Sequence, residues 1–398
     1  MNSPAPRGAE RPQRGTQRSE TVARSNRQWR FVALTCAGLV VFAILAYLGS
    51  LLIRSRALYD QPLRWHGRPY QADTVLGYRP RPGSRANHLL PDGSPVPVVF
   101  DALGLRVSDA ASTSEPEGPS ILFLGDSFTH GWGVPAEQTF AHRATRAVGG
   151  EARNAGVSGW GCAAMILQAE ELIPRLRPAV VVAQASTWLA PRSQALEAPG
   201  RWGRIPVPYF VGSVAEGGLE IAPPIFLGKS FDLPISERSG NGFWPFTKEV
   251  GVPLLTHDDF ERVHSGWARW RGRIPRPAAS RQEVVDHTLG RLRDLSRSVG
   301  ATMVVLVLPI DATNRPVDRF DVVDSNHHPI VDPHAALLAH LESPTAEAWD
   351  RAYAFWAGDP PQLVDRHPNP SYHAVVAATL VPVLREILDT ESRAGAKD

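Results

Sequence analysis

Cysteine and lysine are scarce in this chain of 398 residues. It has two cysteines, Cys36 and Cys162, and its only lysines are Lys229, Lys248 and Lys397, so its basic residues are almost all arginine. Because one cysteine lies in a long apolar run, a disulfide framework is excluded and the fold must be held by packing. A net charge of +2 without a compact basic block excludes a nucleic-acid surface, and we expect no nucleic-acid partner.

Charge is missing altogether from "FVALTCAGLVVFAILAYLGSLLI", residues 31–53. A helix of this length would span about 34 Å, which is enough to cross a bilayer. A cleaved signal peptide and a buried core helix are the alternatives, but the run is longer than a signal h-region and lacks a small-x-small cleavage site. Residues 1–30 have almost no large apolar side chains and are predicted to be a disordered tail.

Arginines flank the apolar run unevenly, which predicts its orientation. Seven precede it and four follow it closely: Arg7, Arg11, Arg14, Arg18, Arg24, Arg27, Arg30, and then Arg54, Arg56, Arg64, Arg68. The excess on the N-terminal side places that terminus in the cytoplasm. We therefore expect a single-pass membrane protein whose residues after Ile53 lie outside the cytoplasm.

The remainder of the chain divides by composition. Residues 54–119 are rich in proline and glycine and predict a stalk with a small β-like cap. Residues 120–390 alternate apolar strands with helices, which predicts an α/β fold with a parallel sheet covered on both faces. The predicted strands are 120–125, 151–159, 178–186 and 301–309, and the predicted helices are 138–150, 163–176, 280–300 and 371–389.

An insertion at 190–279 is too long for an ordinary connection between a strand and a helix. It is interpreted either as a lid or groove wall that contacts substrate, or as a structural flap. Its tryptophans are Trp202, Trp244, Trp267 and Trp270.

A single serine stands out in "FLGDSFTHGWG", residues 123–133, where a short strand meets a tight turn. Such a turn displays Ser127 at the C-terminal end of the strand, where open α/β sheets carry their sites. A serine nucleophile needs a histidine to take its proton and a carboxylate to orient that histidine. "LVDRHPN" offers Asp365 and His367 two residues apart, which an extended turn would direct to the same side. The alternative is that this segment is a solvated loop.

"GDSFTHG", "NAGVSGWG" and "DRHPNPSYH" resemble three sequence blocks of the SGNH (GDSL) hydrolase superfamily. The resemblance implies a three-layer, flavodoxin-like parallel sheet in which Ser127 is the nucleophile, His367 the general base and later acid, and Asp365 its orienting carboxylate. It also implies that the Gly159 N–H and the Ser127 N–H bind the oxyanion. The resemblance implies neither a metal nor a cofactor.

Two polar residues, one in each of the first two blocks, are assigned supporting roles. Asn154 would use its side chain to hold the turn that contains Gly156, and Asp126 would brace the nucleophile turn by accepting from nearby backbone N–H groups.

The third block of the family departs from the expected pattern. Where the family has an asparagine whose side chain binds the oxyanion, "AVVVAQASTWLAP" places Trp188. Either the Trp188 N–H or the hydroxyl of Ser186 or Thr187 replaces this donor, or no third donor exists. Losing one donor costs a factor of about 100 to 1,000 in rate, which still allows an enzyme.

Three further histidine-containing features are interpreted as non-catalytic. His130, three residues after the serine, is expected at the pocket rim, and His373 is expected to be structural. The histidine-rich segment 324–334 matches no metal-binding spacing and is interpreted as a polar loop.

The function predicted on these grounds is ester hydrolysis, with acetate on a bacterial cell-envelope carbohydrate as the substrate. The alternatives are an O-acetyltransferase acting on an exported polysaccharide and a non-catalytic carbohydrate-binding module.

Overall fold

The computed structural model describes residues 29, 32–45, 47, 65–66, 69–90, 93–109, 118–195, 197–200, 203–213, 215, 217–224, 279–313 and 328–395. The chain forms two units, Met1–Asp60 and Gln61–Asp398. The predicted disordered tail up to residue 28 and the insertion tryptophans lie outside the described residues, as does most of the predicted stalk.

The described part of the N-terminal unit is an apolar helix, Val32–Leu45, with exposed side chains such as Leu34 and Phe42. It lies within the predicted span, 31–53, whose remaining residues are mostly outside the described ones, so the membrane span stays a prediction. Among the described helices, one stretch, Pro370–Thr390, has the length and hydropathy of a span. Its Tyr372 is buried against the sheet, as expected for a core helix.

A nine-stranded sheet runs through the C-terminal unit in the order β1-β4-β5-β6-β8-β7-β9-β14-β15. From β8 to β15 neighbouring strands are parallel, and their chain order is 2-1-3-4-5, the flavodoxin-like arrangement. Their bounds are Ser120–Leu124 (β7), Glu151–Asn154 (β8), Val180–Ala185 (β9), Thr302–Val307 (β14) and Ile330–Val331 (β15). The four predicted strands are confirmed. The short β15 was not predicted, because it contains no apolar run of strand length.

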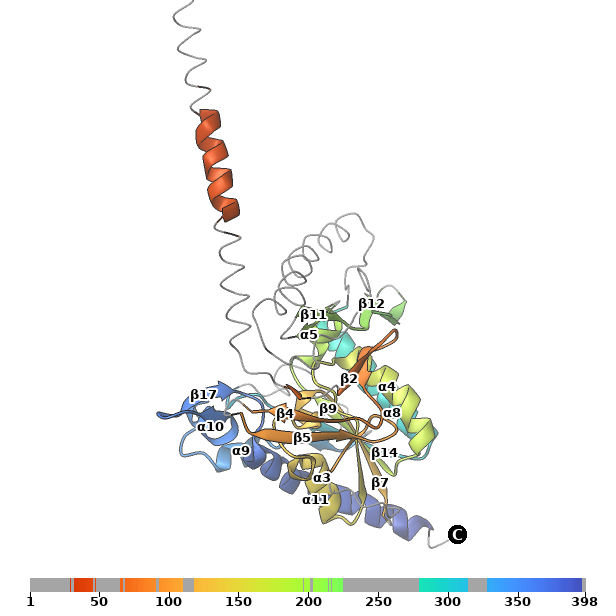
Figure 1. Ribbon diagram of the computed structural model, residues 1–398. Coiled ribbons are helices and arrows are strands. Elements are labelled where there is room, and N and C mark those ends of the chain that lie inside the picture. The colour runs from red at the N-terminus through yellow and green to blue at the C-terminus, as the bar shows by residue number, and fades with distance from the viewer. Residues whose placement is uncertain are drawn as a thin grey trace, which may run out of the picture. The chain divides into compact units, whose positions relative to one another are not determined.

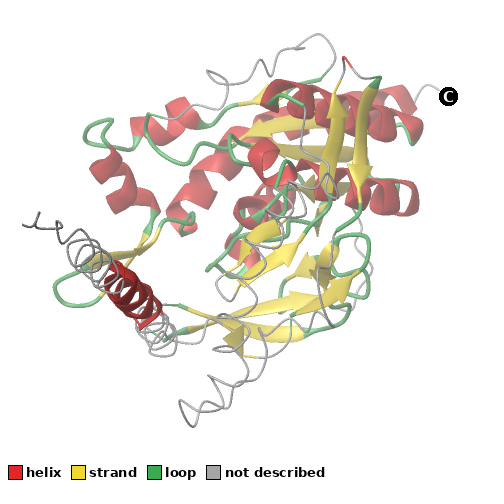
Figure 2. Ribbon diagram, turned by 90° about the horizontal axis from the view of Figure 1, so that it is seen from above, coloured by secondary structure: helices red, strands yellow, loops and turns green. Residues whose placement is uncertain are grey.

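Alternate residues of these strands enter two separate cores. Leu122 and Leu124 of β7 pack in one with helices α4 and α8, and Ile121 and Phe123 pack in the other with α3 and α11. The sheet is therefore the middle of three layers, as predicted (Figure 1). Figure 2 shows helices on both sides of the strands. The helices are α3 (Phe140–Ala147), α4 (Cys162–Leu176), α5 (Leu189–Ser193), α8 (Arg281–Ser298), α9 (His334–Ala339), α10 (Ala346–Tyr353) and α11 (Pro370–Gly395).

Local signals fix the ends of α8. The Ser280 side chain accepts from the Glu283 N–H while the Glu283 side chain accepts from the Ser280 N–H, which completes a capping box. Gly300 has φ of 81°, a value that glycine adopts without strain. Both ends agree with the prediction. Helix α11 continues through Pro382.

The predicted β-like cap is not a separate module. Its strands β1, β4, β5 and β6 extend the central sheet, and the antiparallel pair of Arg106 with Asn154 joins β6 to β8. Proline and glycine at its turns obscured this continuity in the sequence. The bounds are Trp65–His66 (β1), Arg85–Leu89 (β4), Pro95–Phe100 (β5) and Arg106–Val107 (β6), with a separate hairpin of Tyr70–Asp73 (β2) and Gly77–Pro80 (β3).

Two hairpins belong to the beginning of the predicted insertion. Phe210 and Leu219, from the second hairpin, are buried in the core beside α4, so this part of the insertion is structural. The hairpins are Glu197–Gly200 with Gly203–Pro206 (β10, β11) and Tyr209–Ser213 with Gly218–Ala222 (β12, β13). A last hairpin near the C-terminus pairs Phe355–Ala357 (β16) with Gln362–Asp365 (β17).

Candidate active site

Ser127 is the first residue of a short helix, α2 (Ser127–His130), directly after strand β7. The Asp126 side chain caps this helix by accepting from the Phe128 N–H at 3.0 Å, as the bracing role predicted for it requires. The turn is tightly packed, because a Cβ at Gly125 would lie 2.2 Å from Thr129 Oγ1. Gly131 ends the helix with φ of 80°, in the left-handed region. Glycines on both sides therefore allow the sharp turn that carries Ser127.

The structure brings the three predicted triad residues together. His367 follows β17 and places Nε2 3.1 Å from Ser127 Oγ, while its Nδ1 lies 2.6 Å from Asp365 Oδ1. The same carboxylate oxygen accepts from the His367 backbone N–H at 3.0 Å. With Nδ1–H donating to the carboxylate, Nε2 presents its lone pair to the serine hydroxyl. This is the arrangement in which a histidine can remove the hydroxyl proton.

Trp132 completes the surroundings of this pair. Its Nε1–H donates to the other oxygen of Asp365, Oδ2, at 3.3 Å. Its ring centroid lies 5.4 Å from that of the His367 ring and 4.2 Å from that of the His88 ring. The sequence analysis missed this residue. An aromatic five positions after the serine was the only signal, and it did not indicate a contact with a residue 233 positions away.

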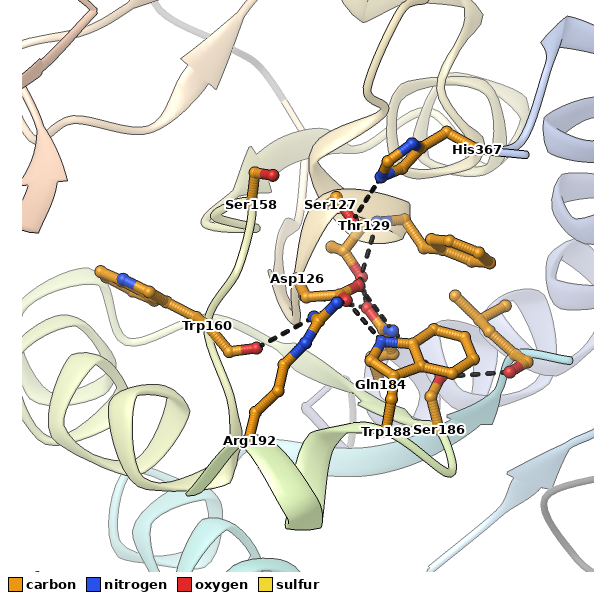
Figure 3. A network of polar contacts seen from close by, with 12 residues as sticks. Asp126, Ser127, Thr129, Ser158, Trp160, Gln184, Ser186, Trp188, Arg192 and His367 are labelled. Carbon is orange, nitrogen blue, oxygen red and sulfur yellow. Dashed lines mark hydrogen bonds and ion pairs between the residues drawn. The ribbon is translucent and has the colours of Figure 1, made fainter. Parts of the chain in front are cut away.

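Asp126 is completely buried and accepts four hydrogen bonds, two on each oxygen (Figure 3). Besides the Phe128 N–H, Oδ1 accepts from Gln184 Nε2 at 2.8 Å. Oδ2 accepts from Trp188 Nε1 at 2.6 Å and from Arg192 Nη1 at 2.5 Å. A buried carboxylate is tolerated only when it is paired and hydrogen-bonded in this way.

Gln184 holds the nucleophile turn from the neighbouring strand, β9. Its Oε1 accepts from the Asp126 N–H at 3.0 Å and from Thr129 Oγ1 at 2.7 Å, and its Nε2 donates to Ser186 Oγ as well as to Asp126. All of its amide hydrogen-bonding groups are thus used. Neither Gln184, in β9, nor Arg192, in α5, was identified from the sequence, because a single polar residue carries no sign of its partner.

Trp188 and Ser186 do not have the oxyanion role considered for them. The single indole N–H of Trp188 is directed at Asp126, and Ser186 Oγ donates to the Leu308 carbonyl at 3.1 Å. Both hydrogens are therefore already used. Trp188 is a partner of the nucleophile turn rather than an oxyanion donor.

A second turn, after β8, lies against the first. Asn154 Nδ2 donates to the Thr129 carbonyl at 2.9 Å and its Oδ1 accepts from the Gly156 N–H at 3.0 Å, as the side-chain role predicted for it requires. A Cβ at Gly156 would lie 2.3 Å from the His130 backbone nitrogen, so only glycine permits this approach. The Val157 N–H donates to the Gly125 carbonyl at 3.1 Å, which ties the two turns together.

Gly159 lies in this second turn with φ of 87°, a left-handed conformation that favours glycine. Within the described part of the chain, no group accepts a hydrogen bond from the backbone N–H of Gly159 or of Ser127. Two backbone donors on adjoining turns are thus available for an external acceptor, which is a requirement for an oxyanion hole.

His130 is buried and does not lie at a pocket rim as expected. Its Nδ1 donates to the Gly156 carbonyl at 3.2 Å, and burial together with the nearby Arg106 guanidinium lowers its pKa well below the usual value. Arg106, also buried, donates to the carbonyls of His130, Gly131 and Val134 at the end of the nucleophile turn. Both side chains therefore help to hold the nucleophile turn in place.

His373 is structural, as predicted. It is buried, its Nδ1 accepts from the Phe140 N–H at 3.2 Å, and its ring stacks on Phe140. Burial, with a smaller contribution from nearby arginines, lowers its pKa to about 3. This histidine is therefore neutral at physiological pH.

The histidine-rich segment lies only partly within the described residues, which resume at His328. There His334 Nε2 contacts the Ala312 carbonyl at 3.0 Å, and Asp332 accepts from the His334 N–H. Among the described residues no group of three or more metal-binding side chains occurs.

Comparison with known proteins gives distant likenesses only. No family model matches the chain, and no curated protein matches it in sequence. Among solved structures it is similar to an acetylxylan esterase from Geobacillus stearothermophilus, with 14% identity over 69% of this chain and 96% of that one and a TM-score of 0.34. It is similar to a GDSL-like lipase from Bacteroides thetaiotaomicron, with 14% identity over 70% and 93% of the two chains and a TM-score of 0.29. A psychrotrophic esterase from a Pseudoalteromonas species has 11% identity over 70% and 100%, with a TM-score of 0.27.

Proposed function

We propose that this protein is a serine hydrolase that cleaves carboxylic esters. The observation that supports the proposal most directly is the chain of contacts from Ser127 Oγ through His367 Nε2 and Nδ1 to Asp365, at 3.1 Å and 2.6 Å. These residues come from segments 240 positions apart, and their hydrogen-bond directions agree with a single tautomer of the histidine. A solvated loop, the alternative interpretation of "DRHPN", would not produce this alignment.

The mechanism follows from these positions. Ser127 Oγ attacks the ester carbonyl carbon while its proton passes to His367 Nε2, and Asp365 stabilises the imidazolium that forms. The negative carbonyl oxygen is bound by the backbone N–H groups of Ser127 and Gly159. When the bond to the alcohol oxygen breaks, Nε2 returns the proton to the leaving alkoxide.

Deacylation repeats these chemical steps with water as the nucleophile. His367 takes a proton from the attacking water, which forms a bond to the acyl carbon, and the proton then returns to Ser127 Oγ as the acid is released. No group beyond these residues and water is needed to balance the reaction.

The substrate proposed is a small acyl group, with acetate on a cell-envelope carbohydrate as the leading candidate. It rests on the resemblance of the sequence blocks to the SGNH superfamily and on the predicted membrane anchor, which would place the site outside the cytoplasm. An acceptor sugar that raises the consumption of an acetyl donor above its hydrolysis would indicate acyl transfer to that sugar instead.

Labelling with a fluorophosphonate tests the enzyme assignment. The full-length protein is expected to be labelled, and Ser127→Ala is expected not to be. Ser108→Ala is a matched control, since Ser108 is a surface serine whose hydroxyl lies 3.4 Å from a Glu137 carboxylate oxygen. Equal labelling of wild type and Ser127→Ala, or no labelling of either, would contradict the proposal.

A further inference from the structure

Helix α5 occupies the corner where the family's third block would supply a side-chain donor. Trp188 and Arg192 stand four residues apart, one helical turn, and both direct an N–H at Asp126 Oδ2. The side chain of Arg192 is 25% exposed, whereas that of Asp126 is fully buried. A cation thus lies one helical turn after Trp188, which stands at the position of the expected asparagine.

Arg192 bridges the two turns that carry the free backbone donors. Its Nη1 lies 2.5 Å from Asp126 Oδ2 and 3.4 Å from the Trp160 carbonyl oxygen (Figure 3). Asp126 directly precedes Ser127, and Trp160 directly follows Gly159. The guanidinium therefore fixes the residues next to both donors, and a planar group with several N–H directions suits such a bridge.

The positive charge of Arg192 also affects how readily a negative charge can develop beside Ser127. Asp126 carries a negative charge one residue from the nucleophile, and a second negative charge would develop on the carbonyl oxygen during attack. Like charges repel strongly where water is excluded. Arg192 is the cation that the structure pairs with Asp126, and it offsets this repulsion.

We propose that Arg192 is a positioning residue that replaces the missing third-block donor: it holds the Ser127 and Gly159 N–H groups at the spacing that binds the oxyanion and supplies a compensating positive charge. The inference rests on the proposed esterase function and names a residue that neither the sequence blocks nor the triad indicated.

The test compares Arg192→Met and Arg192→Lys with wild type in the full-length protein. Turnover of p-nitrophenyl acetate gives kcat and KM, and inhibition by butylboronic acid, which forms a tetrahedral adduct on a serine, reports oxyanion binding. Arg192→Met is expected to lower kcat about 100-fold, to change KM by less than about 3-fold, and to weaken boronate affinity by a factor similar to that in kcat. Arg192→Lys keeps the charge but replaces the longer, planar guanidinium that reaches both Asp126 and Trp160, and is expected to lose about 10-fold in both quantities.

Arg291→Met is the matched control, because Arg291 pairs with Glu170 on the surface at 2.7 Å. It is expected to leave all three quantities unchanged. Thermal unfolding of each variant identifies a loss of folding, and if Arg192→Met does not fold, Arg192→Lys decides the question.

Unchanged boronate affinity in the folded Arg192 variants would overturn the inference, whether or not KM or the unfolding temperature moves, since Arg192 would then only brace the turn. Failure of the proposed function would give a different result: Ser127→Ala would retain p-nitrophenyl acetate turnover, whatever the Arg192 variants do.

Discussion

Two carboxylates flank the candidate nucleophile, and their surroundings differ. Asp365 has a side chain 13% exposed and is paired with a histidine, whereas Asp126 is fully buried and is paired with an arginine and three neutral donors. The first pairing can pass a proton to and from a reacting group, since the His367 Nε2 lies within hydrogen-bond distance of Ser127 Oγ. The second cannot, because the guanidinium of Arg192 only donates hydrogen bonds and keeps its protons. In the proposed mechanism, the carboxylate of Asp365 therefore takes part in proton transfer through His367, whereas that of Asp126 holds the geometry of the nucleophile turn.

Asp365→Asn is expected to have the largest effect among the substitutions that test this difference between the two carboxylates. The amide would no longer hold the productive tautomer of His367, and kcat is expected to fall about 10⁴-fold with little change in stability. Steady-state kinetics and thermal unfolding measure the two effects. A loss of stability equal to that of an Asp126 variant would contradict the division of roles.

Asp126→Asn should show the opposite balance. It leaves the partly buried Arg192 without its counter-charge and replaces Oδ2, which accepts from Trp188 and Arg192, by an NH2 group that cannot accept, so we expect the free energy of unfolding to fall by about 3 kcal/mol. Urea unfolding measures this change. The contrast with Asp365 would be lost if Asp126→Asn were as stable as wild type.

The contrast extends to two histidines six residues apart, His367 at the site and His373 in the core. The folded pKa of His373, about 3, lies below the unfolded value of about 6.5, so the unfolded state binds the proton first as pH falls. Stability is therefore complete above about pH 6.5 and is lost as pH falls toward 3. Each such histidine contributes a slope of about 1.4 kcal/mol per pH unit in this window.

His373→Asn keeps an acceptor for the Phe140 N–H and removes the titration. The slope of unfolding free energy against pH between about 6 and 4 is expected to decrease by about 1.4 kcal/mol per unit. His130 and His142, whose pKa values burial also lowers, would keep their share of the slope. An unchanged slope would show that His373 is not neutral in the folded state.

Trp132→Phe gives the smallest expected effect and sharpens the account of Asp365. It removes one hydrogen bond to the carboxylate but keeps a ring beside His367, so kcat should fall about 5-fold, equivalent to about 1 kcal/mol. Trp356→Phe is a matched control, since Trp356 lies in β16, which pairs with the strand that carries Asp365, and its indole donates to the Asp350 carbonyl of α10 instead of to a carboxylate. Equal effects of the two substitutions would argue against a specific role for Trp132.

The sequence was sufficient for the layers because their signals are local, and for the three candidate site residues because each lies in a short recognisable block. Continuous apolar runs such as 302–307 predict buried parallel strands, and Asp365 lies two residues from His367. A glycine on each side of Ser127 marked the turn.

The contacts of Asp126 had no such signal. Gln184 and Arg192 lie 58 and 66 residues away from it, and they reach the same corner because β9 pairs with β7 and α5 follows β9. The joining of the proline-rich strands to the sheet was equally hidden, because it rests on one bridge between β6 and β8.

That bridge has a practical consequence for work on this protein. Because Arg106 reaches from β6 into the carbonyls that close the nucleophile turn, a shortened version starting at Ser120 would expose the edge of β8 and leave those oxygens unsatisfied. A fragment for crystallisation or enzymology should therefore begin upstream of Trp65, because β1, β4, β5 and β6 belong to the same sheet as the strand that leads into Ser127.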